Sequence, residues 1–401
     1  MSEAEPQAKP LPGKRSLAKR LVFTAIATAV FLVIAVICDR FIGAVSPALP
    51  SSLLFPSGSS VRHKSNEFDV SVAISDAGIR DQNYTPGTPP AGTHRIVAVG
   101  DSFTFGWGVE TEDAWPNIVE RTLSETSTCE VLNFGFPGSS PYDYEGTARK
   151  ALEHFRPHML VIGTLQGDDL IQLHEGQRQE KPLGKVVTQT LFPTFSRLIR
   201  GKVQREPMKS YQETFRMASQ YAISAFSFEE KTRYKAISPT VRDAFEDGLL
   251  NPSLLQRAIK VPEHFSLPCN AEGAWRTTAT DRLRDSLQRV LTACDSYDCK
   301  LVVAVIPDGP YVSAVSGKGL QQVGYTITPD LLQTSVPDSI VAEVCKELGV
   351  TYLIQTDEFR TESKTASYYF PMDGHFNENG HKAFAGRLSA FLKSHIDKPT
   401  E

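Results

Sequence analysis

Short apolar runs alternate along the chain with segments whose apolar residues recur every three or four positions. The short runs are rich in Val, Ile and Leu, which is typical of strands buried on both faces of a sheet. They predict strands at about 96–99, 130–134, 159–162, 300–306 and 351–354, and an alternating strand at 68–74. The periodic segments predict helices at about 115–123, 142–154, 283–293, 341–348 and 380–393. This alternation indicates a three-layer α/β/α fold, in which helices cover both faces of a central parallel sheet.

The pattern changes between about residues 171 and 282, inside the domain that we expect over 94–396. This stretch holds helical segments such as Tyr211–Phe226 and no convincing buried strand. We interpret it as a helical insertion that caps the strand ends and shapes a substrate site. The alternative is a mobile surface excursion with no catalytic role.

A separate apolar segment lies near the N-terminus. Residues 21–38 carry no charge, and extension to residue 42 predicts a transmembrane helix over 21–42. Basic residues precede this segment, namely Lys9, Lys14, Arg15, Lys19 and Arg20. The positive-inside rule then predicts a cytoplasmic tail at 1–20 and an extracytoplasmic domain after the helix. A cleaved signal peptide is the alternative, but the apolar run is longer than a signal core and no clean cleavage site follows.

Residues 43–93 between this helix and the domain are expected to form a linker and a short strand region, the linker ending at about residue 66. The formal net charge of −4 shows no basic footprint, so nucleic acid is not an expected partner. Six cysteines are too scattered for a zinc site or a disulfide scaffold. Cys294 and Cys299 are close enough in sequence to pair in an oxidising compartment, and free buried thiols are the alternative.

Gly100, Asp101 and Ser102 directly follow the strand at 96–99. A serine on a tight turn after a buried strand presents its hydroxyl at the carboxyl edge of a parallel sheet, where open α/β sheets carry their ligand sites. Asp101 is expected to fix the turn through backbone hydrogen bonds. Three aromatic residues follow the serine and are expected to pack in the core, or alternatively to line a pocket: Phe103, Phe105 and Trp107.

A second candidate group lies near the C-terminus, where Asp373, Gly374 and His375 precede the last helix. An imidazole there can act as a general base, and the carboxylate can hold its tautomer. Together with Ser102, the two side chains form a candidate set of nucleophile, base and orienting acid. His381 lies in the same region, but its position suits a capping or surface role better.

These motifs resemble the SGNH/GDSL hydrolase family, whose fold is a flavodoxin-like α/β/α sandwich. Four blocks carry the resemblance in order: Gly100–Ser102, Asn133–Gly138, Gln166–Asp169 and Asp373–His375. The resemblance implies that Ser102 is the nucleophile, His375 the base and Asp373 its partner. It also implies an oxyanion hole made from the backbone N–H groups of Ser102 and Gly138 and from a side chain at position 168.

Two positions depart from the family pattern. Members often have Asp-x-x-His, whereas Gly374 alone separates Asp373 from His375. More seriously, Asp168 stands where the family has an asparagine, and an ionised carboxylate cannot donate to an oxyanion. Either Asp168 is protonated, or another donor replaces it, or activity is low.

The candidate replacement donors for the oxyanion are the Gln166 side chain and the backbone N–H of Gly167. Asp169 is expected to hydrogen-bond to the loops that hold the site. These expectations concern the third block, which lies shortly after the strand at 159–162.

The resemblance implies a serine esterase that needs no cofactor or metal. Its substrate would be a small-molecule or glycan ester, with an acyl group such as acetyl on a carbohydrate or lipid of the bacterial envelope, and its domain would be periplasmic. Transfer of the acyl group to a sugar hydroxyl is an alternative. A third is a carbohydrate-binding or assembly protein with weakened catalysis, which Asp168 favours.

Overall fold

The computed structural model describes residues 17–45, 53–176, 210–270 and 272–396, with a few positions between 188 and 196. The chain divides into two compact units. One comprises residues 1–51 and 179–203, and the other comprises residues 52–178 and 204–401.

The first unit contains helix α1 (Leu17–Val45). Within it, Lys19–Ile42 is a stretch of 24 residues with a mean hydropathy of 2.9, and its most apolar part is not buried. At 1.5 Å per residue this stretch is about 36 Å long, enough to cross a membrane. The helix expected over 21–42 is therefore present, and its length and composition suit either a membrane anchor or a signal sequence.

A parallel sheet forms the centre of the second unit. Its five strands lie in the order β4-β3-β5-β6-β7, and every neighbouring pair is parallel. The strands are β3 (His94–Gly100), β4 (Cys129–Gly135), β5 (Met159–Leu165), β6 (Lys300–Ile306) and β7 (Thr351–Leu353). Counted within this sheet alone the order is 2-1-3-4-5, the flavodoxin-like arrangement. The predicted fold class is confirmed.

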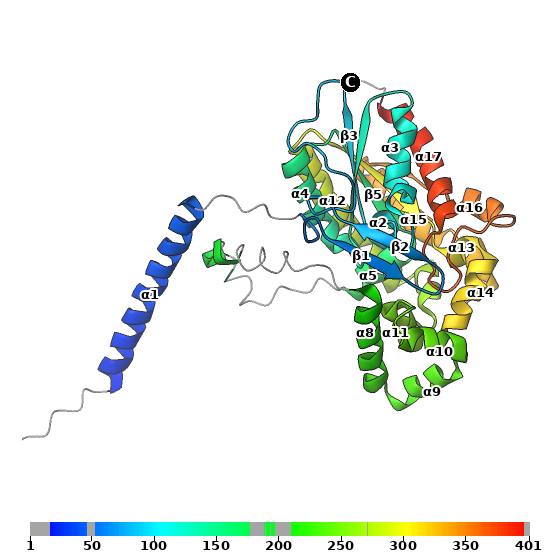
Figure 1. The fold of residues 1–401 in the computed structure, drawn as a ribbon, viewed down its shortest axis with the longest axis horizontal. Coiled ribbons are helices and arrows are strands. Elements are labelled where there is room, and N and C mark those ends of the chain that lie inside the picture. The colour runs from blue at the N-terminus through cyan, green and yellow to red at the C-terminus, as the bar shows by residue number, and fades with distance from the viewer. Residues whose placement is uncertain are drawn as a thin grey trace, which may run out of the picture. The chain divides into compact units, whose positions relative to one another are not determined.

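Helices cover both faces of the sheet, as the alternation of strand side chains requires. On one face Val97, Val99 and their neighbours are buried against four helices. These are α4 (Pro141–Phe155), α5 (Asp168–Glu175), α12 (Ala274–Asp295) and α15 (Val336–Leu348). On the other face Ile96 and Ala98 pack against α3 (Trp115–Ser124), α16 (Thr356–Glu362) and α17 (Glu378–Ile396). Figure 1 shows the sheet between these two layers.

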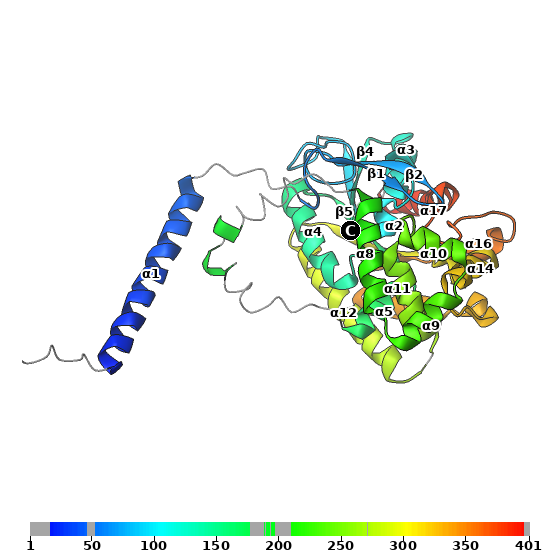
Figure 2. The ribbon, with the colours of Figure 1, turned by 60° about the horizontal axis from the view of Figure 1, so that its bottom comes forward.

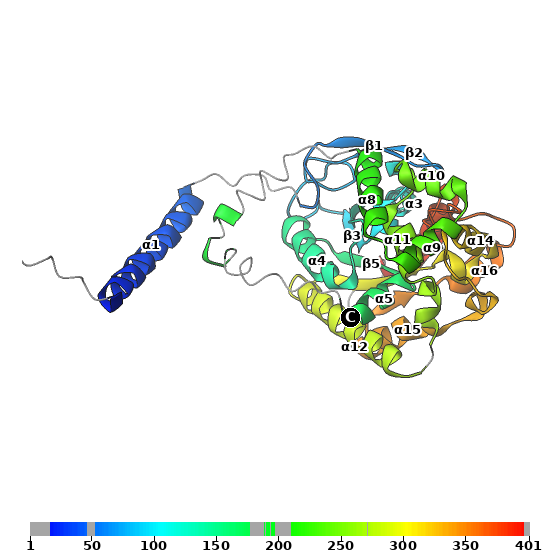
Figure 3. The ribbon, with the colours of Figure 1, turned by 90° about the horizontal axis from the view of Figure 1, so that it is seen from below.

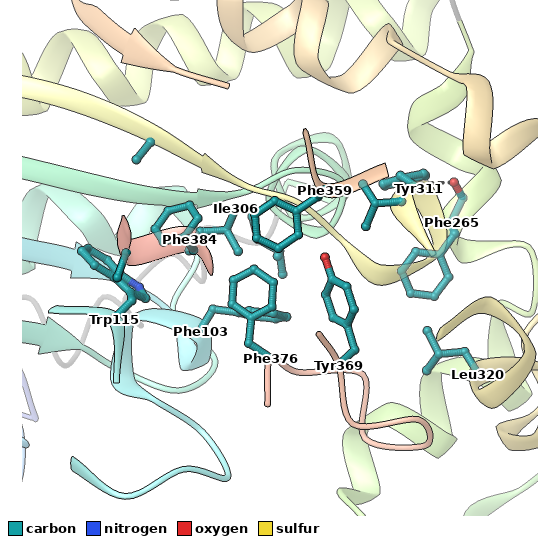
Figure 4. Close-up of a cluster of buried hydrophobic side chains, with 14 of the residues drawn as sticks. Phe103, Trp115, Phe265, Ile306, Tyr311, Leu320, Phe359, Tyr369, Phe376 and Phe384 are labelled. Carbon is teal, nitrogen blue, oxygen red and sulfur yellow. Dashed lines mark hydrogen bonds between the residues drawn. The ribbon is translucent and has the colours of Figure 1, made fainter. Parts of the chain in front are cut away.

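Aromatic side chains fill the second of these layers (Figure 4). The ring of Phe376 stacks on Phe359 at 5.5 Å and 20°, and Trp115 meets Phe384 edge-on at 5.4 Å. Phe376 directly follows His375 in the chain, so the core and the candidate site share one segment.

The region before the sheet is more than a linker. Strand β1 (Ser60–Lys64) pairs antiparallel with β2 (Asp69–Ala73), and the two form a separate sheet. Phe55 and Val72 are buried against Phe105, which follows the candidate nucleophile. The strand predicted at 68–74 is confirmed, whereas the linker interpretation is wrong for the described residues 53–66. They are tied down by pairing with β2 and by packing that the sequence pattern did not reveal.

The predicted insertion is helical in its described part. It contains α8 (Tyr211–Ala225), α9 (Phe228–Ala236), α10 (Pro239–Glu246), α11 (Pro252–Lys260) and the 3-10 turn η2 (His264–Cys269). Its bounds are narrower than 171–282, because α5, which ends at Glu175, and α12, which begins at Ala274, belong to the helical layer on the sheet. Figures 1, 2 and 3 show α8–α11 grouped beyond the carboxyl ends of the strands.

Short elements complete the second unit: α2 (Ser102–Phe105), η1 (Thr111–Asp113), α13 (Gly309–Val312), α14 (Ala314–Val323) and η3 (Pro329–Gln333). All six cysteines lie in described residues and are free. Cys294 and Cys299 are both buried thiols, so the structure has the second of the two alternatives for this pair.

Replacing Phe384 by alanine should destabilise the second unit by about 3–5 kcal/mol, because it leaves a cavity beside Trp115 and Phe376 in a fully buried layer. Chemical unfolding of the full chain, followed by tryptophan fluorescence, measures this change. Val315→Ala on α14 is the control, since Val315 is 59% exposed and its loss should change stability by about 0.5 kcal/mol or less. Equal effects of the two variants would contradict the assignment of this core.

Candidate active site

Ser102 lies at the start of α2, directly after the carboxyl end of β3. The side chain of Asp101 caps this short helix by accepting a hydrogen bond from the backbone N–H of Phe103 at 2.9 Å. Gly100 has no room for a side chain, because a Cβ there would lie 2.1 Å from Oγ1 of Thr104. The turn and the packing beneath it therefore hold the serine hydroxyl at the sheet edge. Asp101 fixes this turn through a backbone hydrogen bond, as expected.

The loop before α17 brings the second candidate group to this serine. Nε2 of His375 lies 2.7 Å from Oγ of Ser102, and Nδ1 of His375 lies 2.5 Å from Oδ1 of Asp373. Gly374, between them, has a φ of +80°, a conformation that suits glycine. This turn allows the two side chains to meet across the short Asp-x-His spacing. The three residues predicted as a set are thus in hydrogen-bond contact.

Two aromatic rings flank the imidazole. The ring of Phe103 lies 4.7 Å from that of His375. The indole of Trp107 stacks on the same imidazole, with 5.4 Å between the ring centroids and 28° between the ring planes. Nε1 of Trp107 also donates to Oδ2 of Asp373 at 3.2 Å. Trp107 is therefore part of the site and not only a packing residue, whereas Phe105 is fully buried beneath it.

Electrostatics favour an ionised Asp373 beside a basic His375. Burial opposes the charge on Asp373, but His375 and the Trp107 hydrogen bond hold its pKa below the ordinary value. Burial likewise opposes a charge on His375, but the negative charges of Asp373, Asp101 and Asp168 raise the pKa of His375 above its ordinary 6.5. Such an imidazole is a competent general base once it is neutral.

Glu67, in the turn between β1 and β2, fixes the loop that carries Asp373. Its carboxylate accepts hydrogen bonds from the backbone N–H of Met372 at 2.9 Å and of Asp373 at 2.7 Å. The sequence reasoning missed Glu67, since it placed this region at the boundary of a linker. No local motif marks the residue, because its partners lie about 300 positions away in the chain.

Two backbone N–H groups were expected to serve as oxyanion donors, those of Ser102 and Gly138. Gly138 is exposed with a φ of +81°, and a Cβ at this position would meet no atom within 4 Å. Among the described residues, the backbone N–H groups of Gly138 and Ser102 have no recorded hydrogen-bond partner. Both N–H groups therefore have no competing partner within the described chain.

The third expected donor is absent from position 168. Burial opposes the charge of Asp168, but Arg257 and the hydrogen bonds from His264 and Gln172 hold its pKa well below the ordinary value. Nε2 of His264 lies 3.0 Å from Oδ1, and Nε2 of Gln172 donates to Oδ2 at 2.5 Å. Asp168 therefore acts as an acceptor for three donors, and these contacts favour its ionised form over the protonated form.

The two proposed replacement donors are also committed elsewhere. Nε2 of Gln166 donates to Asp338 at 2.8 Å and to Thr356 at 3.1 Å, in a fully buried position. The backbone N–H of Gly167 donates to Oδ2 of Asp308 at 2.8 Å. The predictions of Gln166 and Gly167 as oxyanion donors are wrong, because each group donates to a buried acceptor. The sequence pattern did not reveal these acceptors.

The two remaining predicted residues lie in the interior. Asp169 is fully buried and accepts hydrogen bonds from Tyr144 at 2.8 Å and from the backbone N–H of Leu165 at 3.1 Å, so it holds the strand end as expected. His381 is also fully buried, and its Nδ1 accepts from the backbone N–H of Trp115 at 3.2 Å. The surface role expected for His381 is wrong because the ring is buried, whereas its capping contact is made to the first N–H of α3 and not to its own helix. Burial lowers the pKa of His381 to about 3.

A cavity of about 700 Å³ lies between the insertion and α14. Its lining includes Met372, the residue before Asp373, together with Ile237, Val241 and Gln322. This volume is in the range of small-molecule sites.

No family model and no curated protein matches the chain. Solved structures do match. A lipase/acylhydrolase from Enterococcus faecalis has 11% identity and a TM-score of 0.36, with 77% of this chain and 99% of that chain covered. An acetyl xylan esterase, AlAXEase, has 11% identity and a TM-score of 0.35, with 74% and 99% covered.

A lipolytic protein of the G-D-S-L family from Desulfitobacterium hafniense has 13% identity and a TM-score of 0.32, with 74% of this chain and 98% of that chain covered. The chain is thus similar to structures of the class that its motifs resemble. At identities and TM-scores this low, the likeness concerns the fold alone. The chemistry of the site is argued from the geometry of the site.

Replacing Asp373 by asparagine should lower the pKa of the His375 ring, because it removes the largest charge that raises this pKa. In the native chain the ring should lose its proton above pH 6.5, and in Asp373→Asn at a lower pH. Titration of the histidine ring resonances by NMR measures both values. Asp357→Asn, at an exposed position on α16, should leave the His375 titration unchanged. An unchanged His375 pKa in Asp373→Asn would contradict the ion pair.

Proposed function

We propose that the chain is a serine esterase of the SGNH/GDSL type, anchored by α1 with its second unit outside the cytoplasm. The observation that carries this proposal is the hydrogen-bonded series from Ser102 through His375 to Asp373, assembled from segments more than 270 residues apart. A buried series of hydroxyl, imidazole and carboxylate is the arrangement that activates a serine for acyl transfer.

In the proposed reaction Oγ of Ser102 attacks the ester carbonyl carbon, and Nε2 of His375 takes the hydroxyl proton. The carbonyl electron pair moves to the oxygen, which the N–H groups of Ser102 and Gly138 stabilise. The C–O bond to the alcohol then breaks, and His375 returns the proton to that alcohol. Water, deprotonated by His375 in turn, releases the acid from Ser102.

The substrate proposed is a small-molecule or glycan ester of the cell envelope, with an acyl group such as acetyl. Support comes from α1 and from the cavity beside Met372, which has room for an alcohol part larger than the acyl group. Orientation with residues 1–20 in the cytoplasm is proposed from the basic residues before α1.

Weakened catalysis remains the second candidate, and one observation favours it. The carboxylate of Asp168 is ionised at the position of an expected donor, and loss of one oxyanion donor costs about 100- to 1,000-fold in rate. A binding protein on the same fold would tolerate that loss.

A fluorophosphonate probe should label the native full chain at Ser102, because an activated serine attacks phosphorus as it attacks a carbonyl. Labelling and aryl acetate hydrolysis should both fall by about 10⁴-fold or more in Ser102→Ala and His375→Ala. Ser224→Ala, at an exposed serine on α8, is the matched control and should behave as the native chain. A native chain that is neither labelled nor hydrolytic would refute the esterase proposal.

Replacing Glu67 by alanine should lower kcat for aryl acetate by about 10- to 100-fold, because the loop with Asp373 loses two anchoring hydrogen bonds and the base shifts from Ser102. Glu67→Gln keeps one acceptor oxygen and should lose less. Steady-state kinetics provide the measurement, with Glu213→Ala on the exposed side of α8 as control. Native kcat in Glu67→Ala would show that the loop is held without this clamp.

A further inference from the structure

We propose that Arg257, on insertion helix α11, donates a hydrogen bond to the oxyanion in place of the side chain that Asp168 cannot supply. This inference rests on the esterase function proposed above. It assigns a catalytic residue to the helical insertion, which none of the four sequence motifs includes.

Asp168 places Arg257 at the sheet edge. Nη1 of Arg257 donates to Oδ1 of Asp168, the same oxygen that accepts Nε2 of His264. Asp168 begins α5 just after β5, and β5 is the direct neighbour of β3, which ends before Ser102. Because adjacent strands are about 4.8 Å apart, Asp168 lies at the same sheet edge as the nucleophile, and its hydrogen bond holds the guanidinium there.

The charge of Asp168 acts on both residues that flank the nucleophile. It contributes to the raised pKa of His375, whose Nε2 contacts Ser102, and to the raised pKa of Asp101, which precedes Ser102. The ion pair of Asp168 and Arg257 is thus close to the reacting hydroxyl in electrostatic terms. An ionised carboxylate alone at this point would repel an oxyanion, and a paired guanidinium removes that repulsion.

Arg257 has donors to spare. A guanidinium carries five N–H groups and stays protonated at any working pH. Within the described part of the chain, only the bond to Asp168 is recorded for it, and its side chain is 39% exposed. Arg257 can therefore meet a ligand while Asp168 holds it.

The buried side of the pair explains why the arginine stays in place. His264, 3% exposed, comes from η2 and fixes Oδ1 of Asp168 from within the protein. Gln172, one turn further along α5, occupies Oδ2. Both carboxylate oxygens are thereby oriented, and the guanidinium is a preorganised donor of the kind that stabilises developing charge.

In the reaction, Arg257 forms and breaks no covalent bond. As Ser102 attacks, the carbonyl electron pair moves to oxygen, and N–H groups of Ser102, Gly138 and Arg257 donate to it. When the C–O bond to the alcohol breaks, the pair returns to the carbonyl and these hydrogen bonds weaken. The proton moves only between Ser102, His375 and the leaving alcohol.

The test compares Arg257→Gln, Arg257→Lys and the double variant Asp168→Asn/Arg257→Gln in the full chain, with an uncharged aryl acetate. Arg276→Gln is the matched control. Arg276 is a partly buried arginine of α12 that forms an ion pair with Glu343 on α15. The readouts are kcat, KM, the rate of fluorophosphonate labelling and the unfolding midpoint.

Arg257→Gln should lower kcat and the labelling rate by about 100- to 1,000-fold, while KM changes by about threefold or less, because the bond forms only in the transition state. Arg257→Lys should recover part of the loss, since an ammonium donates without the fork of the guanidinium. The double variant should exceed Arg257→Gln in kcat by about tenfold, because the amide introduced by Asp168→Asn can donate directly. Arg276→Gln should keep native kinetics.

Native kcat and labelling in Arg257→Gln would overturn the inference. So would a loss confined to KM and to esters with an anionic substituent, which would make Arg257 a recognition site for a substrate anion. A fall in the unfolding midpoint with unchanged kcat would assign Arg257 a structural role and overturn it as well. A native chain without labelling or hydrolysis would refute the esterase function itself, which is a different outcome from any of these.

Discussion

The ion pair between Asp373 and His375 lies almost out of contact with water, where an unpaired charge would cost several kcal/mol. Neighbouring side chains hold the pair in place. Trp107 donates to the second carboxylate oxygen, and Glu67 accepts the backbone N–H of Asp373, so that the loop has one conformation. The position of Ser102 relative to its base depends on this loop, and hence on strands from the N-terminal region and on the core around Phe376.

The N-terminal hairpin and the helical insertion both reach the candidate site. His63 of β1 is buried between Trp107 and Tyr211, with ring distances of 4.4 and 4.1 Å, and Tyr211 begins α8. Burial lowers the pKa of His63 to about 4, so the ring packs as a neutral aromatic group. The parallel sheet therefore positions Ser102. Segments outside the sheet support His375 and provide Arg257, the charged partner of Asp168.

The carboxylate of Asp168 determines how the side chains around it are arranged. An acceptor at this point demands donors, and the structure provides them from two parts of the insertion, Arg257 and His264. The neighbouring Gln166 and Gly167 donate to other buried acceptors, Asp338 and Asp308. The negative charge of Asp168 is thereby balanced by the positive charge of Arg257.

The sequence by itself determined the α/β alternation, the limits of the five strands of the parallel sheet to within a few residues, and the pairing of Ser102 with Asp373 and His375. These follow from local periodicity and from the rule that parallel strands present their carboxyl ends at one edge. Only the tertiary structure decided the roles of Glu67, Trp107 and His381, and the ionisation of Asp168. The reason is physical: burial and the charge of partners hundreds of positions away set hydrogen bonding and pKa, and no local pattern encodes them.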